Sequence, residues 1–430
     1  MYISTNPGTM FRVYTGLAIT LMGSAMNAQA TDGYFSQGYG MKSAGMGGAS
    51  VAMTDNAFAG ANNPAIASWA GDRMEVGLTV FMPSRGMQRT GGTALQPASV
   101  DSDSNTFYIP EFGYNRTISP HWAVGLTVYG NGGMNTDYAG RNYNCGAGAN
   151  SANVLCGTGR LGVDLQQLII APTIAYKISD NQSVGFSPLL IKQIFKADGL
   201  QGFSLMSGDA AHLTNSGYAN SDGVGMRVGY LGKITPGLSV GASYAPKASM
   251  SKFSQYAGLF AGGGNFDIPE NYAAGISFQL TPSVQLAADY QAIKYGGVTS
   301  IGNPSTNAAP LGAANGPGFG WTDINVYKIG VEWQVAPQLQ LRAGVNVCDD
   351  PVNSANVTFN ILAPGVMTNH YTLGGTYALD QKTELTFAYV YASSNSVTGA
   401  SLYNGMGMSA GNETVKMSQQ SLGIQLGWKF

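Results

Sequence analysis

The chain has 430 residues, of which only 10% are charged and 60 are glycine, and its formal net charge is −2. Soluble domains carry about 25% charged residues, and a mean hydropathy near zero disfavours a bundle of membrane helices. No stretch after the N-terminus reaches the roughly 18 apolar residues of a spanning helix, and no Lys/Arg-rich run suggests a nucleic-acid partner. Low charge with many Gly and Tyr residues is typical of a β-barrel in lipid.

Residues 1–30 have the features of a signal peptide. Arg12 precedes the apolar run "VYTGLAITLMGSAM", which is too short to span a membrane, and Ala28-Gln29-Ala30 forms a small-x-small cleavage site. We expect cleavage before Thr31, with Met10 as an alternative start; the competing interpretation is a short buried helix. An exported protein without a stop-transfer segment can reside in the periplasm, in the outer membrane or in the medium.

Residues 31–71 do not alternate in polarity. They are small, rich in Gly and Ala, and interrupted by Asn62-Asn63-Pro64-Ala65. The lumen of a fourteen-stranded barrel is too wide for its own side chains to fill. We therefore expect this segment to act as an N-terminal hatch, a plug inside the barrel formed by residues 72–430.

The remainder of the chain consists of segments with apolar residues at every second position. In "MEVGLTVFM", for example, Met74, Val76, Leu78 and Val80 share one face of a strand. We predict fourteen strands, at about 73–82, 105–118, 121–131, 164–178, 182–195, 223–235, 237–248, 270–281, 283–295, 322–335, 339–349, 369–379, 383–394 and 416–430. Short turns such as Thr235-Pro236 alternate with long Gly/Asn/Ser-rich loops. The predicted fold class is an all-β membrane protein, a 14-stranded antiparallel transmembrane β-barrel with the hatch in its lumen.

Enzyme and metal motifs are weak. Gly237-Leu238-Ser239-Val240-Gly241 matches G-x-S-x-G, but it lies within an alternating strand, whereas a nucleophile elbow needs a strand-turn-helix. Only three His occur, and they form no clustered Cys/His pattern. We therefore expect that the protein binds no metal or cofactor and is not an enzyme. An outer-membrane enzyme acting on lipids is the alternative from another class, and a surface adhesin is a third.

Three cysteines are present. Cys145 and Cys156 fall in one long external loop, and an exported protein lies in an oxidising compartment. We expect a Cys145–Cys156 disulfide and a free Cys348.

The mature chain resembles the FadL/TodX-type outer-membrane channels for long-chain fatty acids and aromatic hydrocarbons. The resemblance is carried by "GYGMKSAGMGGASVAMTDNAFAGANNPA" with its Asn63-Pro64-Ala65 signature, by "YIPEFGYNRTISPHWAVGLTVYG", by "LRAGVNVCDDPV" and by the terminal Phe430. Members of that family usually have a Tyr near the position of Val347-Cys348, so this chain departs from the family pattern there. The resemblance implies a passive Gram-negative outer-membrane channel for fatty acids first and aromatic hydrocarbons second. It also implies outer-membrane lipid and lipopolysaccharide as surroundings, recognition of Phe430 by the barrel-assembly machinery, and a monomer.

Two external loops are unusually apolar. Their side chains either pack on one another or form an interaction site, and both can hold; in the family, these loops form a first, weak binding site for hydrophobic substrates. The candidate residues are Phe203, Leu205, Met206, Phe253, Leu259 and Phe260.

Strand parity directs several charged residues into the lumen, namely Glu75, Glu111, Arg227, Asp289, Lys328, Glu332, Arg342 and Glu384. A turn at Ala336-Pro337-Gln338 sets Glu332 opposite Arg342, so we predict a structural ion pair. Arg227 and Lys328 have no evident partner, and either could meet a fatty-acid carboxylate.

A lateral exit is expected in the third strand. A hydrophobic ligand gains by entering the bilayer, but a closed ladder of backbone hydrogen bonds forbids sideways passage. Alternation is weakest at Tyr129, Gly130, Gly132 and Gly133, Pro110 removes a donor nearby, and the family is kinked in this strand. We predict a gap or bulge here that faces Asn63-Pro64-Ala65 or the segment just before it; an ordinary loop start after Gly130 is the alternative.

Overall fold

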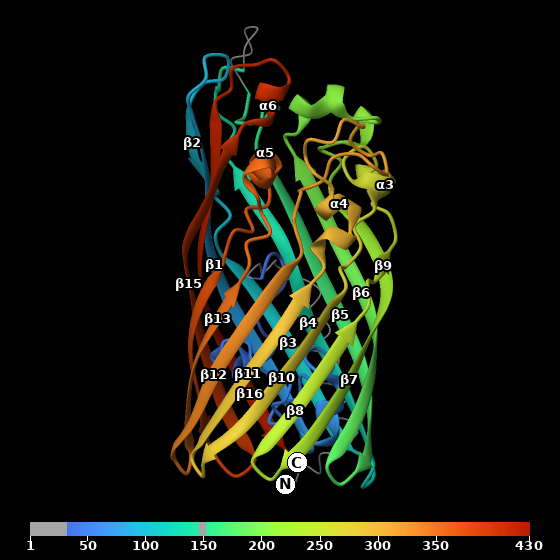
Figure 1. Ribbon diagram of the computed structural model, residues 1–430, viewed down its shortest axis with the longest axis vertical. Coiled ribbons are helices and arrows are strands. Elements are labelled where there is room, and N and C mark those ends of the chain that lie inside the picture. Colours follow the sequence, from blue (N-terminus) through green and yellow to red (C-terminus); the bar gives the residue numbers. More distant parts are fainter. Residues whose placement is uncertain (1–31, 146–151) are drawn as a thin grey trace, which may run out of the picture.

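The computed structural model describes residues 32–145 and 152–430, so the predicted signal peptide lies outside the described residues. Fourteen of its strands form a closed antiparallel barrel (Figure 1). They are β1 (Arg73–Thr90), β3 (Phe107–Thr117), β4 (Trp122–Tyr138), β5 (Leu161–Ser179), β6 (Gln182–Asp198), β7 (Ala219–Thr235), β8 (Leu238–Ala245), β10 (Asn271–Thr281), β11 (Val284–Ile293), β12 (Ile324–Ala336), β13 (Leu339–Cys348), β14 (Asn369–Ala378), β15 (Thr383–Ala400) and β16 (Asn412–Lys429). The register between β16 and β1, from Arg73 opposite Lys429 to Thr90 opposite Asn412, closes the barrel. The predicted fourteen-stranded antiparallel barrel is confirmed.

Smaller elements lie in the lumen and in the long loops. Two short strands, β2 (Ala98–Asp101) and β9 (Ser249–Met250), add to the edges of β1 and β7. The helical turns are α2 (Met41–Gly45), η1 (Pro64–Ser68), η2 (Gln201–Met206), η3 (Ala210–His212), η4 (Ser254–Tyr256), α3 (Ala261–Gly264), η5 (Tyr295–Gly297), α4 (Thr299–Gly302), η6 (Ser354–Asn356), α5 (Val357–Asn360) and α6 (Leu402–Gly405). No helix within residues 32–145 or 152–430 is long and apolar enough to cross a membrane.

Several strands extend further than predicted at the end that carries the long loops. β1 was expected to end at residue 82 but continues to Thr90, and β15 was expected to end at 394 but continues to Ala400. Outward positions in these extensions are polar, as at Ser84, Gln88 and Ser396, so the apolar half of the alternation disappears while strand pairing continues. The apolar pattern therefore marked the membrane belt rather than the full strand.

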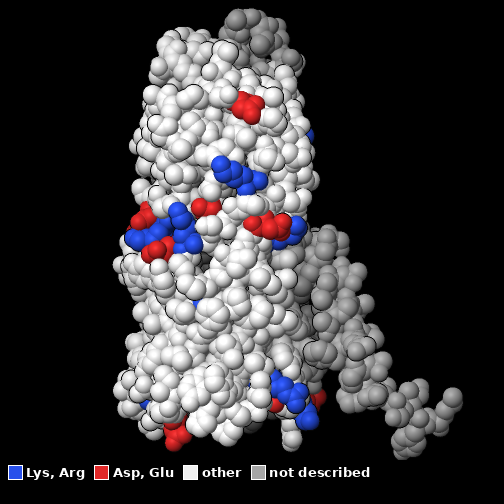
Figure 2. Space-filling view, turned by 90° about the vertical axis from the view of Figure 1, so that its right-hand side faces the viewer, with Lys and Arg blue, Asp and Glu red and all other residues white. Residues whose placement is uncertain are grey.

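The outer surface carries that belt. Large apolar side chains such as Leu422, Ile424 and Leu426 point outward at every second position and are 53%, 53% and 39% exposed. Figure 2 shows charged residues gathered in a band about half way up and at the lower end, with a nearly uncharged zone between them. A polar rim on each side of an apolar zone is the surface that a bilayer requires.

Residues 32–71, called the hatch here, run through the lumen and are almost entirely buried (Figure 1). Asn63 begins η1: its side-chain oxygen accepts from Ala65 N, and its amide donates to Val51 O (2.8 Å) and to Tyr230 O of β7 (2.9 Å). At Gly47 (φ +67°) the hatch touches the wall, where an added Cβ would lie 2.5 Å from Val345 O. The segment is thus tied to the barrel through polar contacts and through one glycine without room for a side chain.

The loop cysteines are joined. Cys145 and Cys156 form a disulfide with a Cα–Cα distance of 5.7 Å, and the Cys348 thiol is free and buried in the lumen. This is the pairing expected from the sequence.

Cysteine labelling tests this arrangement. Under native, unreduced conditions we expect no cysteine to react with iodoacetamide, after reduction two, and after denaturation three, because Cys348 is only 6% exposed. Mass spectrometry of the tryptic peptides measures each state. Free Cys145 and Cys156 thiols in exported protein would contradict the prediction.

Candidate functional site

The external loops enclose an apolar cavity. It is lined by Phe203, Leu259 and Phe260 together with residues that carry no charge: Val163, Phe195, Leu200, Ser300, Leu311, Pro317, Gly318, Phe319, Phe359 and Leu362. We call it the external cavity. The rings pack closely, with centroids 4.6 Å apart for Phe195 and Phe260. The loops therefore pack on one another and also leave an apolar space, while their use as an interaction site stays a prediction.

The remaining loop candidates do not line that cavity. Phe253 is fully buried against Phe195 and Phe260, and Met206 packs partly against the core. Leu205 is entirely exposed at the loop surface. A first contact with a hydrophobic molecule is thus available at Leu205, outside the cavity.

Aromatic side chains connect the external cavity to the hatch. Phe260 contacts Phe266 (centroids 4.9 Å apart), and Phe266 contacts Tyr34 at the start of the hatch (6.2 Å). Tyr295 packs on Tyr34 and Trp321, and its hydroxyl accepts from Tyr34 N at 3.1 Å. An apolar path therefore leads from the loops down to the first described residues of the hatch.

The barrel wall is interrupted between β3 and β4. Their ladder runs only from Thr117 opposite Ala123 to Phe112 opposite Val128, although β3 begins at Phe107 and β4 continues to Tyr138. On the other side β4 remains paired with β5, with a register shift between Gly130 and Gly132. The end of the ladder and the bulge fall on the stretch Tyr129 to Gly133 that the sequence singled out.

The start of the hatch covers the edge of β4 that β3 leaves unpaired. Ser36 N donates to Asn131 O and Gly133 N donates to Tyr34 O, both at 3.1 Å, around a bridge between Phe35 and Gly132. A Cβ on Gly132 would lie 1.7 Å from Tyr34 O, so only glycine permits this approach. We call these contacts the partition.

The expectation that Asn63-Pro64-Ala65 or the segment just before it faces the opening is wrong, because Tyr34 to Ser36 lie there. The structure places this tripeptide against β6 and β7, where Gly185 and Gly229 leave room for it. A free strand edge needs extended main chain with available N–H and C=O groups. Tyr34 to Ser36 provide them, whereas Pro64 has no N–H and begins a helical turn.

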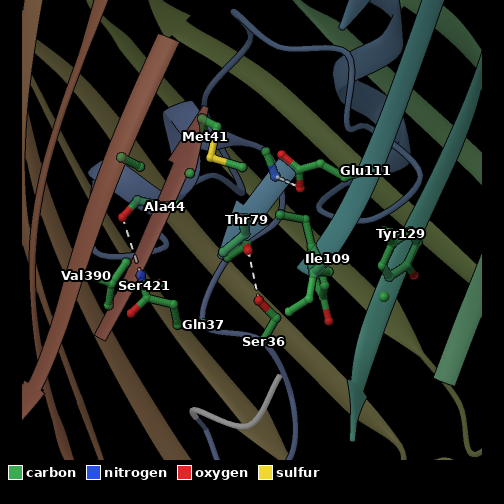
Figure 3. A pocket seen from close by; sticks show the side chains of 16 residues that line it. Ser36, Gln37, Met41, Ala44, Thr79, Ile109, Glu111, Tyr129, Val390 and Ser421 are labelled. Atoms are coloured by element: carbon green, nitrogen blue, oxygen red, sulfur yellow. Dashed lines mark hydrogen bonds between the residues drawn. The ribbon is translucent and has the colours of Figure 1, made fainter. Parts of the chain in front are cut away.

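The partition separates two pockets. The upper pocket is lined by Gly33, Tyr34, Phe81, Arg85, Gly133, Met134, Asn135, Trp321, Ala363, Pro364, Gly365 and Met417. The lower pocket lies between the hatch residues Ser36 to Met41 and the wall residues Thr79, Ile109, Glu111, Tyr129 and Gly130 (Figure 3). Because Ile109, Tyr129 and Gly130 lie in the unpaired part of β3 and β4, the lower pocket lies beside the interruption.

The two lumen cations proposed to meet a carboxylate have different surroundings. Lys328 Nζ donates to Gln37 O (2.7 Å) and Gln291 Oε1 (2.9 Å) and lies 3.8 Å from Asp32 Oδ2, so the lack of a partner inferred from the sequence is wrong. Arg227 donates to Gly60 O at 3.3 Å. Both line a polar pocket below the partition, with Asp289 nearby. Gln37, Asp32 and Gly60 belong to the hatch, whose position strand parity does not reveal, whereas Gln291 belongs to β11.

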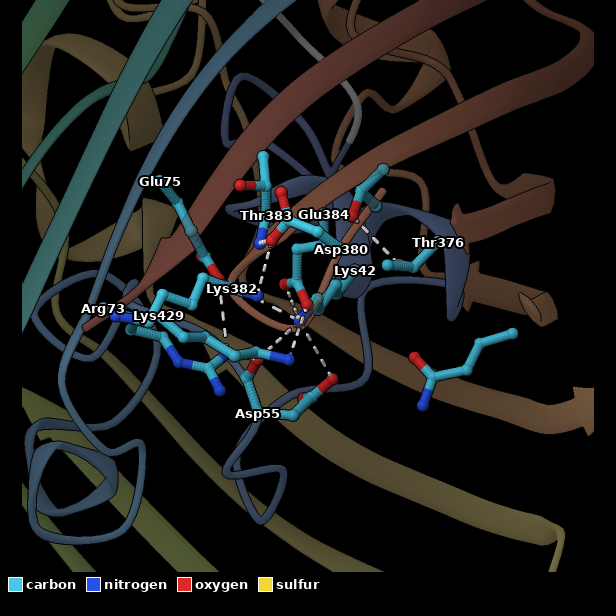
Figure 4. Close-up of polar contacts among 12 residues, drawn as sticks. Lys42, Asp55, Arg73, Glu75, Thr376, Asp380, Lys382, Thr383, Glu384 and Lys429 are labelled. Atoms are coloured by element: carbon cyan, nitrogen blue, oxygen red, sulfur yellow. Dashed lines mark hydrogen bonds and ion pairs between the residues drawn. The ribbon is translucent and has the colours of Figure 1, made fainter. Parts of the chain in front are cut away.

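An ionic cluster fixes the hatch at the base of the lumen (Figure 4). Lys42 Nζ lies 2.6 Å from Glu384 Oε1, 3.6 Å from Asp55 Oδ2 and 4.0 Å from Glu75 Oε1. Burial opposes ionisation of Asp55, but the charges of Lys42, Arg342 and Arg73 outweigh it and hold the pKa of that carboxyl below its usual value. Lys42 is therefore the hub of the cluster.

The predicted wall pair joins the same cluster. Glu332 stands opposite Arg342 in the β12–β13 register, and their side chains are 2.6 Å apart. Arg342 also lies 3.7 Å from Asp55 of the hatch. The pair is thus both a cross-strand contact and a link to the hatch.

Three features were missed from the sequence. The lumen alternation of β1 continues through Arg85, Met87 and Arg89, and following the inward parity beyond residue 82 would have found them. The roles of Lys42 and of Tyr34 to Ser36 have no local signal, because their partners lie far away in the chain.

Ser239 of the G-x-S-x-G match lies within β8, opposite Ser277 of β10, and has no nucleophile-elbow geometry.

A closed barrel with an apolar belt, a lumen plugged by its own N-terminal segment and an interrupted wall define an outer-membrane channel protein. The chain matches the family of outer membrane transport proteins described as OMPP1/FadL/TodX over residues 18–430, and it belongs to this family. Membership places it in the outer membrane of a Gram-negative bacterium.

Solved structures share the fold. The Pseudomonas putida toluene transporter TodX aligns with a TM-score of 0.67 at 18% identity, covering 92% of this chain and 99% of that one. A Pseudomonas aeruginosa FadL homologue aligns at 0.68 and 14% identity, covering 93% and 100%. The Ralstonia pickettii toluene transporter TbuX aligns at 0.63 and 19% identity, covering 92% and 99%. None of the curated proteins matches this chain by sequence.

Removal of the Lys42 ammonium tests its role as the hub. Lys42→Met removes one cation from the buried Glu75 and Glu384, which keep Arg73 and Lys429, so we expect the free energy of unfolding to fall by about 1–3 kcal/mol. The midpoint of heat-shifted gel mobility measures the effect.

The matched control is Lys416→Met, because Lys416 pairs with Asp101 at 3.0 Å on the exposed surface. A change below about 1 kcal/mol is expected there. Equal midpoints for the two variants would show that Lys42 is not a structural hub.

Proposed function

We propose that the protein is a passive uptake channel for hydrophobic molecules, with long-chain fatty acids as the foremost substrate. The observation that supports this best is the interruption between β3 and β4, where a lumen pocket meets the lipid-facing wall. A hydrophobic molecule lowers its free energy by passing from such a pocket into the bilayer, so transfer needs no other energy source.

The proposed route has three steps. The apolar loops capture the ligand and hold it in the external cavity, whose lining carries no charge. The ligand then descends along the aromatic residues to the upper pocket, and the partition blocks the way to the lower pocket. Release of the start of the hatch from β4 opens the passage, and the ligand leaves sideways between β3 and β4.

Aromatic hydrocarbons are the second candidate substrate. This alternative is favoured by the aromatic lining at Tyr34, Phe35, Tyr295 and Trp321 and by the similarity to the toluene transporters TodX and TbuX. An uptake assay in a strain without other such channels, with a panel of fatty acids and alkylbenzenes, separates the two. Failure of the chain to promote uptake of any member of the panel would refute the proposed function.

Filling the wall opening tests the lateral exit. In Gly130→Trp the indole projects from the edge of the opening toward Ile109, whose Cγ2 lies 3.3 Å from the position of an added Cβ. We expect fatty-acid uptake to fall by about tenfold or more, since the proposed route then lacks its outlet. Leu126→Trp, on the same strand where β3 and β4 are paired, is the control and keeps wild-type uptake. Wild-type uptake by well-folded Gly130→Trp protein would exclude this exit.

Displacing the partition is the converse test. The Cβ of Gly132→Ala collides with Tyr34 O at 1.7 Å, so the start of the hatch must leave β4, and we expect faster uptake and higher single-channel conductance in planar bilayers. Gly130→Ala adds the same methyl group two residues away without meeting backbone atoms closer than 4.0 Å. This control retains wild-type behaviour. Identical conductance of the two variants would contradict a gating role for the partition.

A further inference from the structure

Two buried guanidinium groups in the lumen lack the adjacent carboxylate that comparable groups have. Among the residues that the structure describes, seven Lys and Arg side chains are buried: Lys42, Arg73, Arg85, Arg89, Arg227, Lys328 and Arg342. All except Arg85 and Arg227 lie within 4.0 Å of a carboxylate. A buried cation without an adjacent counter-charge is unfavourable, and Asp164, which acts on Arg85, is not within 4.0 Å of it, so an additional anion would be favoured at these two positions.

Arg85 is the better placed of the two. Arg227 lies among polar residues below the partition, with Asp289 in the same pocket. Arg85 lines the upper pocket, whose other side chains are mainly apolar, such as Phe81, Trp321 and Met417. The upper pocket thus combines one cation with an apolar surface, which matches a ligand that has one anionic group and an apolar body.

The free edge of the Arg85 guanidinium is suited to a carboxylate. Nη1 donates to Asn135 O at 2.6 Å, Nη2 makes only a 3.5 Å contact with Ser102 Oγ, and Nε has no partner among the described residues. Nε and Nη2 form one edge of the planar group, and two parallel N–H donors are the geometry that binds a carboxylate. The ring of Phe107, 5.4 Å from Cζ, holds the group from another side.

Arg89, the next inward arginine on β1, has the same Nε–Nη2 edge bound to a carboxylate. Arg89 Nε and Nη2 both donate to Glu413 Oε1, at 2.9 and 2.5 Å, and Glu413 stands opposite Arg89 in the β1–β16 register. Four residues along the same pair of strands, Met417 stands opposite Arg85. The wall therefore supplies a carboxylate to one arginine and an apolar side chain to the other.

We propose that Arg85 is the residue that recognises the carboxylate of an alkyl monocarboxylate in the upper pocket, with the chain lying on the surrounding apolar side chains. This inference rests on the proposed function and narrows it: Arg85 makes the pocket prefer an anionic amphiphile over a neutral hydrocarbon of equal size. The ligand pauses above the partition with its carboxylate on Arg85 before the start of the hatch moves.

Binding of two ligands of equal chain length tests the proposal. Purified protein in nanodiscs is titrated at pH 8 with radiolabelled palmitate and with radiolabelled hexadecanol, which lacks the charge. For Arg85→Met we expect palmitate affinity to fall about tenfold or more and hexadecanol affinity to stay within about twofold. An equal loss for both ligands would make Arg85 a structural residue, and unchanged palmitate binding would remove its proposed role.

A second pair of variants leaves Arg85 in place. Met417→Glu supplies the carboxylate that Glu413 gives to Arg89, so it should compete with palmitate and lower its affinity as Arg85→Met does. Met417→Gln has nearly the same shape without the charge and should bind palmitate more tightly than Met417→Glu does, because only the carboxylate competes for Arg85. Equal palmitate affinity for these two variants overturns the proposal even if Arg85→Met does not fold.

The outcomes separate this inference from the proposed function. If wild-type and Arg85→Met proteins take up palmitate and alkylbenzenes equally well, the channel function stands and the role of Arg85 is refuted. Wild-type protein that binds and transports neither class removes the proposed function itself.

Discussion

Every backbone N–H and C=O group within a bilayer must be paired, and the structure depends on this constraint. The barrel meets it by closing β16 on β1, and it can leave a wall strand unpaired only where other main chain takes over. At β4 that main chain comes from Tyr34 to Ser36 of the hatch. The hatch and the wall opening therefore depend on each other, because the unpaired edge of β4 is stable only while the hatch pairs with it.

The charges of the lumen follow a division between base and top. At the base, Lys42, Glu384, Arg342 and Glu332 neutralise one another and bind the lower hatch firmly to the wall. At the top, the start of the hatch is held by main-chain hydrogen bonds and by packing against aromatic rings such as Tyr295. A firmly anchored base with a more weakly held start allows local movement without loss of the plug.

The sequence predicted what depends on local patterning. Alternation with period two gave the strand number and the inward-facing residues, and the turn at Ala336-Pro337-Gln338 placed Glu332 opposite Arg342. Membrane strands are predictable in this way because lipid imposes the same polarity on every outward position. The ends of β1 and β15 were missed because they lie above the apolar belt, where lipid no longer requires apolar outward residues.

The path of the hatch was not predictable, since its contacts join residues hundreds of positions apart. Lys328 looked unpaired because its acceptor, Gln37 O, is a backbone atom of the plug. The same reasoning explains why Asn63-Pro64-Ala65 was assigned to the wrong wall position: the tripeptide is conspicuous in sequence, but the strand edge selects for extended backbone and not for side-chain identity.

The seal at β4 consists of main-chain atoms and of a position where only glycine fits, whereas the pockets on either side of it consist of side chains. Nearly any residue at 34 to 36 can make those hydrogen bonds, so substitutions that reshape the pockets leave the seal intact. On the proposed route, side chains of the upper pocket set the choice of ligand and main-chain atoms set the closure of the wall. Apart from Tyr34, whose backbone makes the seal and whose side chain lines the pocket, the lining can then change between relatives without altering the barrier.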